Sequence, residues 1–345
     1  MDLSEQALER INRRIGNVVR GTYTLERLLG IGGMGAVYAA RSSDGRTVAV
    51  KSLHTELSRV TSIQTRFFRE AYVGNTIEHP GVARVFEHGT DDDGCAFIVM
   101  ELLEGETLEA LWERRGHKLP VGLVLAVAER LLDVLAAAHA TGIIHRDIKP
   151  DNVFMTSGGD LKVLDFGIAR LLEGTSATAS GELMGTPAFM PPEQAGGNSK
   201  TADGRADVWS VGAVMYTMIS GRHVHDAPTH PLQLIYAATQ KARSLRDVAP
   251  ETPHGVVELV DHALAFDREA RWPSARAMLE RVRALATESI PPTVAAPPQE
   301  AVLATLRDDP SARSLSPPLV SGPTLPMGRM VIENKPSKPP GGREK

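Results

Sequence analysis

The stretch His145-Arg146-Asp147-Ile148-Lys149-Pro150-Asp151-Asn152 decides how the rest of this 345-residue chain is interpreted. It follows an apolar run over 123–139 whose spacing predicts a helix. The Asp147 carboxylate can accept a proton from a hydroxyl, Lys149 can neutralise charge on a moving phosphoryl group, and the amide oxygen of Asn152 can bind a hard cation. Thirteen residues after Asn152, Asp165-Phe166-Gly167 adds a second carboxylate beside a glycine. The pattern indicates phosphoryl-transfer chemistry.

Length and composition are those of an ordinary globular protein. With 345 residues, 42% of them apolar and 23% charged, the chain is expected to form about two domains or lobes. The net charge of −4 gives no reason to expect nucleic acid or an anionic membrane as a partner. Cys95 is the single cysteine, so a disulfide framework is excluded and a reducing compartment fits. No stretch has the roughly 18 uninterrupted apolar residues of a membrane span, and the chain does not open with a secretory signal, so we expect a cytoplasmic protein.

A glycine-rich stretch lies nearer the N-terminus. Gly30-Ile31-Gly32-Gly33-Met34-Gly35-Ala36-Val37 contains the pattern G-x-G-x-x-G, which dinucleotide-binding folds share. In those folds a helix starts at the glycines and an acidic residue follows about 20 positions later. Here the glycines lie between two strand-like runs, and Val48-Ala49-Val50-Lys51 follows. This order favours a glycine hairpin whose backbone N–H groups approach phosphate oxygens, with Lys51 reaching the same phosphates.

Together these stretches resemble the Hanks-type, or eukaryotic-like, serine/threonine protein kinases of bacteria. The resemblance implies an α+β, two-lobed fold: a small lobe over 22–101 with an antiparallel β-sheet and one helix, and a larger, mostly helical lobe over 102–287. A short amphipathic helix is expected in an N-terminal extension over 1–21. Twelve of the 23 prolines follow Ser289, so a disordered tail is expected over 288–345.

The resemblance also implies ATP, with Mg²⁺ or Mn²⁺, in the cleft between the lobes. Lys51 would pair with Glu70 on a helix over 63–76, and Met100 would be the gatekeeper beside the adenine. The backbone of Glu101 and Leu103 would bond the adenine. The implied ATP-binding set is Gly30, Ile31, Gly32, Gly33, Met34, Gly35, Val37, Ala49, Lys51, Met100, Glu101, Leu103, Thr107, Phe154 and Asp165.

Catalytic roles follow from the same resemblance. Asp147 would accept the proton of the substrate hydroxyl, while Asn152 and Asp165 would hold the metal ion. Lys149, two places after the base, favours Ser/Thr over Tyr substrates. Thr186 would contact Asp147 and Lys149 and frame the acceptor site; the alternative for Thr186 is an autophosphorylation site.

Control by phosphorylation is a further expectation. Arg66, Arg146 and Arg170 match positions that gather on an activation-loop phosphate, at Thr178 or Ser180. Three solvated arginines are the alternative, and Thr175 and Ser176 are alternative acceptors. Autophosphorylation in trans would require self-association.

Three structural expectations complete the resemblance. Glu193 would pair with Arg271, Asp207 would bond the backbone of the catalytic stretch, and Gly74 would loosen the helix that carries Glu70.

The expected function is transfer of the ATP γ-phosphate to Ser/Thr hydroxyls of proteins. One alternative is a pseudokinase scaffold that binds partners without catalysis, which the presence of Lys51, Asp147 and Asp165 disfavours. Another is a small-molecule phosphotransferase of related fold, which the segment with Thr186 and Pro192-Glu193 disfavours.

Overall fold

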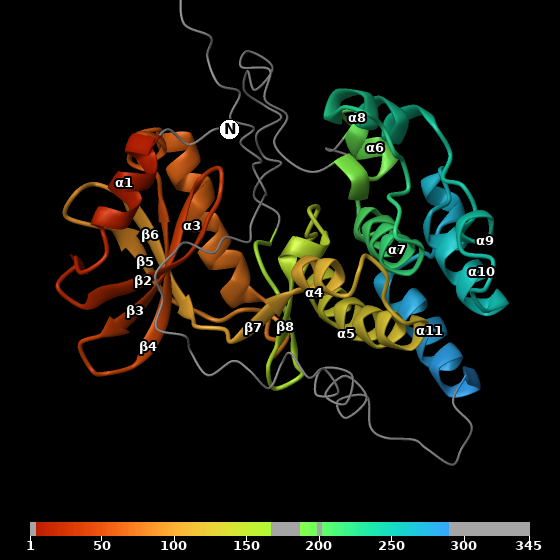
Figure 1. The fold of residues 1–345 in the computed structure, drawn as a ribbon, viewed down its shortest axis with the longest axis horizontal. Coiled ribbons are helices and arrows are strands. Elements are labelled where there is room, and N and C mark those ends of the chain that lie inside the picture. The colour runs from red at the N-terminus through yellow and green to blue at the C-terminus, as the bar shows by residue number, and fades with distance from the viewer. Residues whose placement is uncertain (1–4, 167–186, 199–201, 290–345) are drawn as a thin grey trace, which may run out of the picture.

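The computed structural model describes residues 5–166, 187–198 and 202–289, and Figure 1 shows two lobes with β7 between them. The elements of the first lobe are α1 (Glu5–Arg13), β1 (Val18–Val19), β2 (Tyr23–Ile31), β3 (Gly35–Ser42), β4 (Thr47–Leu53), α2 (Thr55–Ser58), α3 (Thr61–Thr76), β5 (Val85–Thr90) and β6 (Ala96–Glu101). Those of the second are β7 (Gly105–Thr107), α4 (Leu108–Arg114), α5 (Val121–Ala140), η1 (Pro150–Asn152), β8 (Val153–Thr156), β9 (Leu161–Val163), η4 (Pro187–Phe189), α6 (Pro192–Ala195), α7 (Arg205–Ser220), α8 (His230–Thr239), α9 (Leu245–Val248), α10 (His254–Ala263), η6 (Arg268–Ala270) and α11 (Ala275–Ser289). This arrangement confirms the predicted α+β, two-lobed fold.

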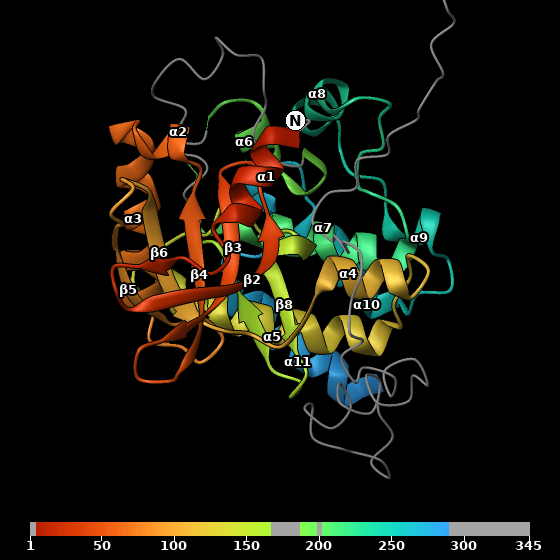
Figure 2. The ribbon, with the colours of Figure 1, turned by 60° about the vertical axis from the view of Figure 1, so that its left-hand side comes forward.

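The small lobe is built on a six-stranded antiparallel sheet with the order β1-β2-β3-β4-β6-β5. Because side chains alternate along a strand, each central strand carries side chains on both faces of the sheet. Leu53 and Ile98 pack against α3 on one face. Val50 and Val99 lie in a separate cluster on the other face, together with Ile11 of α1. Figure 2 shows α1 across the strands on this second face.

The N-terminal extension is tied firmly to the sheet. Ile11 is buried, and the hydroxyl of Tyr38 on β3 donates a hydrogen bond to its carbonyl at 3.0 Å. Arg14 donates to the Ser52 hydroxyl at 2.8 Å and forms an ion pair with Asp91 in the turn between β5 and β6. Helix α1 lies within the segment for which the sequence predicts a short amphipathic helix. Beyond that prediction, the extension adds β1 to the sheet.

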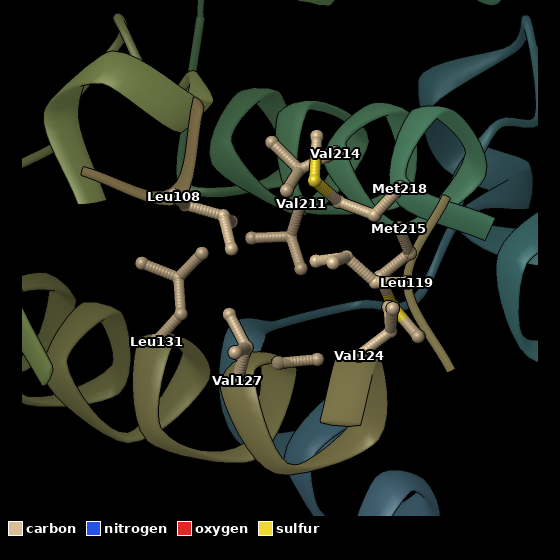
Figure 3. Close-up of a pocket in the computed structure, with 10 residues that line it drawn as sticks. Leu108, Leu119, Val124, Val127, Leu131, Val211, Val214, Met215 and Met218 are labelled. Carbon is tan, nitrogen blue, oxygen red and sulfur yellow. The ribbon is translucent and has the colours of Figure 1, made fainter. Parts of the chain in front are cut away.

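The large lobe is organised around α5 and α7. Helix α7 is buried from Ala206 to Ser220, which explains its apolar character on every side. Figure 3 shows Leu131 of α5 and Val211 and Met215 of α7 facing one another across a small apolar cavity. Helix α11 packs along α5. Among the described helices, none has the length and apolar character that crossing a membrane requires.

Candidate active site

The catalytic stretch 145–152 follows α5 in the chain, and Asp207 of α7 holds its backbone in place. The two oxygens of this fully buried carboxylate accept hydrogen bonds from the backbone N–H of His145 at 2.9 Å and of Arg146 at 2.7 Å. The Nε2–H of His139 donates to it at 2.7 Å. Burial alone would raise the pKa of Asp207, but the His139 hydrogen bond, the neighbouring histidines and the backbone donors outweigh burial and lower it. The expected contact of Asp207 with this backbone is confirmed.

Two residues of the site adopt left-handed backbone angles that favour glycine. The φ of Arg146 is 65° and that of Asp165 is 54°. Such conformations cost about 1–3 kcal/mol and persist only where the surroundings hold them. Here the bonds to Asp207 hold the first of these turns.

The side chains of the catalytic stretch converge on Asp147. Its Oδ2 lies 3.3 Å from Lys149 Nζ and accepts a hydrogen bond from Asn152 Nδ2 at 3.0 Å. The same Asn152 nitrogen donates to the Asp147 carbonyl at 2.8 Å. These bonds fix which end of the Asn152 amide is nitrogen and turn its oxygen away from Asp147.

A short hairpin brings the second carboxylate to the same place. After β8 and β9, the Leu164 N–H donates to the Asn152 carbonyl at 2.9 Å, and the Leu164 carbonyl accepts from His145 Nε2 at 3.0 Å. The buried Phe166 ring lies 4.7 Å, centroid to centroid, from the His145 ring. Asp165, between Leu164 and Phe166, is therefore held beside the catalytic stretch.

Lys51 on β4 completes the group from the other lobe. Its Nζ lies 2.6 Å from Asp165 Oδ1, although 114 residues separate the two in the chain. Glu70 lies on α3, as predicted, but its side chain is outside the described part of the structure.

The glycine hairpin joins β2 to β3 next to Lys51. The Gly32 N–H donates to the Gly35 carbonyl at 2.8 Å and closes the turn. A Cβ on Gly35 would lie 2.1 Å from the Ser52 carbonyl oxygen, so only glycine allows β3 and β4 to approach so closely. Val37 is paired with Lys51 across β3 and β4, which places the residues predicted for the phosphates on neighbouring strands.

The residues predicted around the nucleoside lie at the connection between the lobes. Met100 is the last residue but one of β6 and packs against the cluster under α3, and Ala49 is paired with it across β4 and β6. Phe154 and Thr107 are paired across β7 and β8. The Thr107 hydroxyl accepts the Ala110 N–H at 3.1 Å and so caps α4, a structural role that accounts for a threonine there.

The side chain of Glu101 links three segments at this connection, a contact that no motif predicts. Its Oε1 lies 2.6 Å from Lys162 Nζ on β9 and accepts the Arg84 N–H at 2.8 Å. The ion pair joins the last strand of the small lobe to the hairpin before Asp165.

A second acidic residue that belongs to no motif, Glu109, lies on α4, which packs against η1 of the catalytic stretch. Burial, followed by the charges of Asp151 and Glu113, raises the pKa of Glu109 to about 7. This carboxyl therefore carries a proton for part of the time near neutral pH.

The predicted regulatory residues are only partly within the described structure. Arg66 lies on α3 and Arg146 in the catalytic stretch. Arg170, Thr178 and Ser180 lie outside the described residues, as do Gly167 and the predicted acceptor-site residue Thr186.

The predicted pairing of Glu193 with Arg271 is confirmed. Two nitrogens of the buried Arg271 guanidinium donate to the Glu193 carboxylate at 2.9 and 2.8 Å. The guanidinium also lies over the Trp209 ring, 4.9 Å from its centroid. The pair ties the segment after η4 to the core helix α7.

The oxygen groups of the site suit a hard divalent cation. The carboxylate of Asp165 and the amide oxygen of Asn152 are ligands of the kind that Mg²⁺ prefers. Because the Asn152 nitrogen is engaged by Asp147, its oxygen is the end available to a metal. The residues present therefore fit this cofactor.

Comparison with known proteins agrees with this geometry. Residues 23–282 match the model of the protein kinase domain. The chain is 36% identical over 337 residues to the serine/threonine-protein kinase PksC of Streptomyces coelicolor, covering 93% of this chain and 58% of the relative. It is 33% identical over 311 residues to PknA of Mycobacterium tuberculosis, covering 87% and 70%, and 38% identical over 276 residues to pkn2 of Myxococcus xanthus, covering 77% and 33%.

Solved structures show the same fold. The crystal structure of the PknI kinase domain of Mycobacterium tuberculosis matches with a TM-score of 0.61 and 26% identity, covering 78% of this chain and 98% of that one. The chain thus belongs to the protein kinase family, and residues 23–282 form a kinase domain of the bacterial serine/threonine type.

Proposed function

We propose that this chain transfers the γ-phosphate of ATP to Ser or Thr hydroxyls of proteins. The observation that carries the proposal is the 2.6 Å contact of Lys51 with Asp165, which is itself held beside Asp147 through Leu164 and His145. A cation from one lobe and two carboxylates from the other thus meet in one place. Phosphoryl transfer requires mainly such positioning and charge stabilisation.

Each residue has a distinct role in this proposal. Asp147 orients the acceptor hydroxyl and accepts its proton, and Lys149 stabilises negative charge on the transferred group. Lys51 binds the non-transferred phosphates. Asn152 and Asp165 would hold Mg²⁺, which when bound neutralises charge on the phosphates.

Substitution of Asp147 tests the catalytic role. Removing a positioned general base typically costs ~10²–10⁴-fold in rate. We expect the rate of phosphate transfer from Asp147→Asn to a generic protein acceptor to fall by that factor. The variant should still bind ATP, and titration calorimetry measures that affinity. Asp160→Asn, which removes a carboxylate from the turn between β8 and β9, is the matched control and should remain active. Wild-type turnover by Asp147→Asn would refute the role.

Regulation by autophosphorylation in trans is part of the proposal. A phosphate on Thr178 or Ser180 adds about −1.5 to −2 of charge and can form one to three bonds with arginines such as Arg66 and Arg146. A Thr178→Ala/Ser180→Ala protein should then stay at the low activity of the unphosphorylated wild type, with Thr287→Ala as control. Activity equal to that of fully phosphorylated wild type would contradict this mechanism.

We also propose that the chain acts in the cytoplasm. Its one cysteine, Cys95, is a buried free thiol, as expected in a reducing compartment.

A further inference from the structure

His54 attaches the end of β4 to the glycine hairpin through two hydrogen bonds. Its backbone N–H donates to the Met34 carbonyl at 2.9 Å. Its ring Nε2 lies 3.1 Å from the Gly32 carbonyl oxygen. Because a carbonyl oxygen only accepts, Nε2 carries the proton and donates it. His54 is the N-cap of α2 but makes no side-chain capping bond, so its ring serves the hairpin instead.

The contact determines which way one peptide group of the hairpin points. In a planar trans peptide the C=O and the following N–H point in opposite directions. Since the Gly32 carbonyl points to His54, the Gly33 N–H points away from it. No described residue accepts a hydrogen bond from this N–H.

The alternation of β4 shows what lies on that opposite side. Lys51 and Leu53 face α3 and Asp165, whereas Val48 and Val50 face the cluster with Ile11. The backbone of His54 is also extended, so the alternation continues through it. Its ring therefore lies on the side of the sheet opposite to the Lys51 side chain. The Gly33 N–H therefore points to the side where Lys51 ends.

We infer that His54 is a positioning residue for nucleotide phosphates: it anchors the Gly32 carbonyl so that the Gly33 N–H is directed at a phosphate oxygen. The inference rests on the proposed function, because it requires phosphates beneath the hairpin. His54 does not touch the nucleotide. It acts by keeping one peptide group of a flexible glycine segment in the orientation that binding needs.

The test compares ligands with and without phosphates. Titration calorimetry on the full chain measures the affinities for ADP and for adenosine in wild type and His54→Ala. A neutral hydrogen bond contributes a factor of about two to ten, so ADP binding should weaken by that factor. Adenosine binding should not change. His254→Ala, which removes an exposed histidine from α10, is the control.

Two further variants keep the test decisive if His54→Ala is less stable. The amide nitrogen of glutamine reaches about as far from the backbone as Nε2, whereas that of asparagine reaches only as far as Nδ1. His54→Gln should therefore keep the wild-type ADP affinity, and His54→Asn should lose affinity as alanine does.

The results separate this inference from the proposed function. Unchanged ADP affinity in His54→Asn and His54→Ala, or equal weakening for ADP and adenosine, overturns the inference and leaves the kinase assignment intact. A wild type that binds adenosine as tightly as ADP overturns the placement of phosphates under the hairpin, and the inference with it.

Discussion

Replacing Asp207, the buried carboxylate that binds the backbone of the catalytic stretch, should weaken both the fold and the catalysis. In Asp207→Asn the size is kept, but one oxygen becomes an NH₂ group that faces a donor. At least one of the hydrogen bonds from His145 N and Arg146 N, 2.9 and 2.7 Å long, is then lost. Each bond to a charged group contributes about 1.5–3 kcal/mol, and breaking a buried charged network costs about 3–5 kcal/mol. We expect the free energy of unfolding to fall by about 3–4 kcal/mol.

The loss should also reach the chemistry, because the left-handed turn at Arg146 is held by the same bonds and Asp147 follows it directly. A displaced base costs up to about 100-fold in rate, so kcat should fall about 10- to 100-fold with little change in the affinity for ATP. Urea unfolding and steady-state kinase assays on one preparation measure both effects. Asp203→Asn, which removes a half-exposed carboxylate just before α7, should cost under about 1 kcal/mol. An Asp207→Asn protein with wild-type stability and kcat would refute this reasoning.

Three further outcomes are expected. Arg271→Lys, which keeps the charge but loses the two-pronged contact and the stacking, should lower the free energy of unfolding by about 2–3 kcal/mol in urea titrations. Gly105→Ala should lower the melting temperature strongly, because φ is 146° and a Cβ would lie 2.0 Å from a backbone carbonyl oxygen; a wild-type melting temperature would show that this turn can relax. Burial, partly offset by the charge of Asp226, lowers the pKa of His223 and His225 below the ordinary value of 6.5. Below pH 6.5 the unfolded chain therefore binds more protons than the folded chain, and the free energy of unfolding should fall as the pH drops. Melting temperatures between pH 7.5 and about pH 5 should therefore decline less in His225→Leu than in wild type, and parallel declines would contradict this assignment.

Much of the site could be predicted from the sequence because most of its residues lie in short motifs that follow one another in a fixed order. Asp147, Asn152 and Asp165 are close together in the chain and in space, and Asp207 and Arg271 lie in motifs of their own. The pairing of Glu193 with Arg271 could be predicted across 78 residues for that reason. The glycine pattern could be interpreted because the runs on both sides are strands, which excludes a dinucleotide turn.

The remaining contacts could not be predicted because they join common residue types that carry no motif. Arg14 reaches Asp91 only because α1 folds over the sheet, and Glu101 reaches Lys162 only because β9 lies under the connection between the lobes. His54 is one histidine among eleven, and nothing in its neighbours in sequence marks the Gly32 carbonyl as its partner. Such pairings depend on how whole elements pack, which local patterns do not specify.

The attachment of α1 has a practical consequence for anyone who trims this protein. The match to the kinase domain begins at residue 23, yet Ile11 fills the outer face of the sheet and Arg14 neutralises the buried Asp91. A recombinant fragment that starts at the family boundary would expose the apolar residues that pack against Ile11 and leave Asp91 without its Arg14 partner. Poor yield or low activity of such a fragment would then result from the missing N-terminal residues rather than from the kinase domain itself.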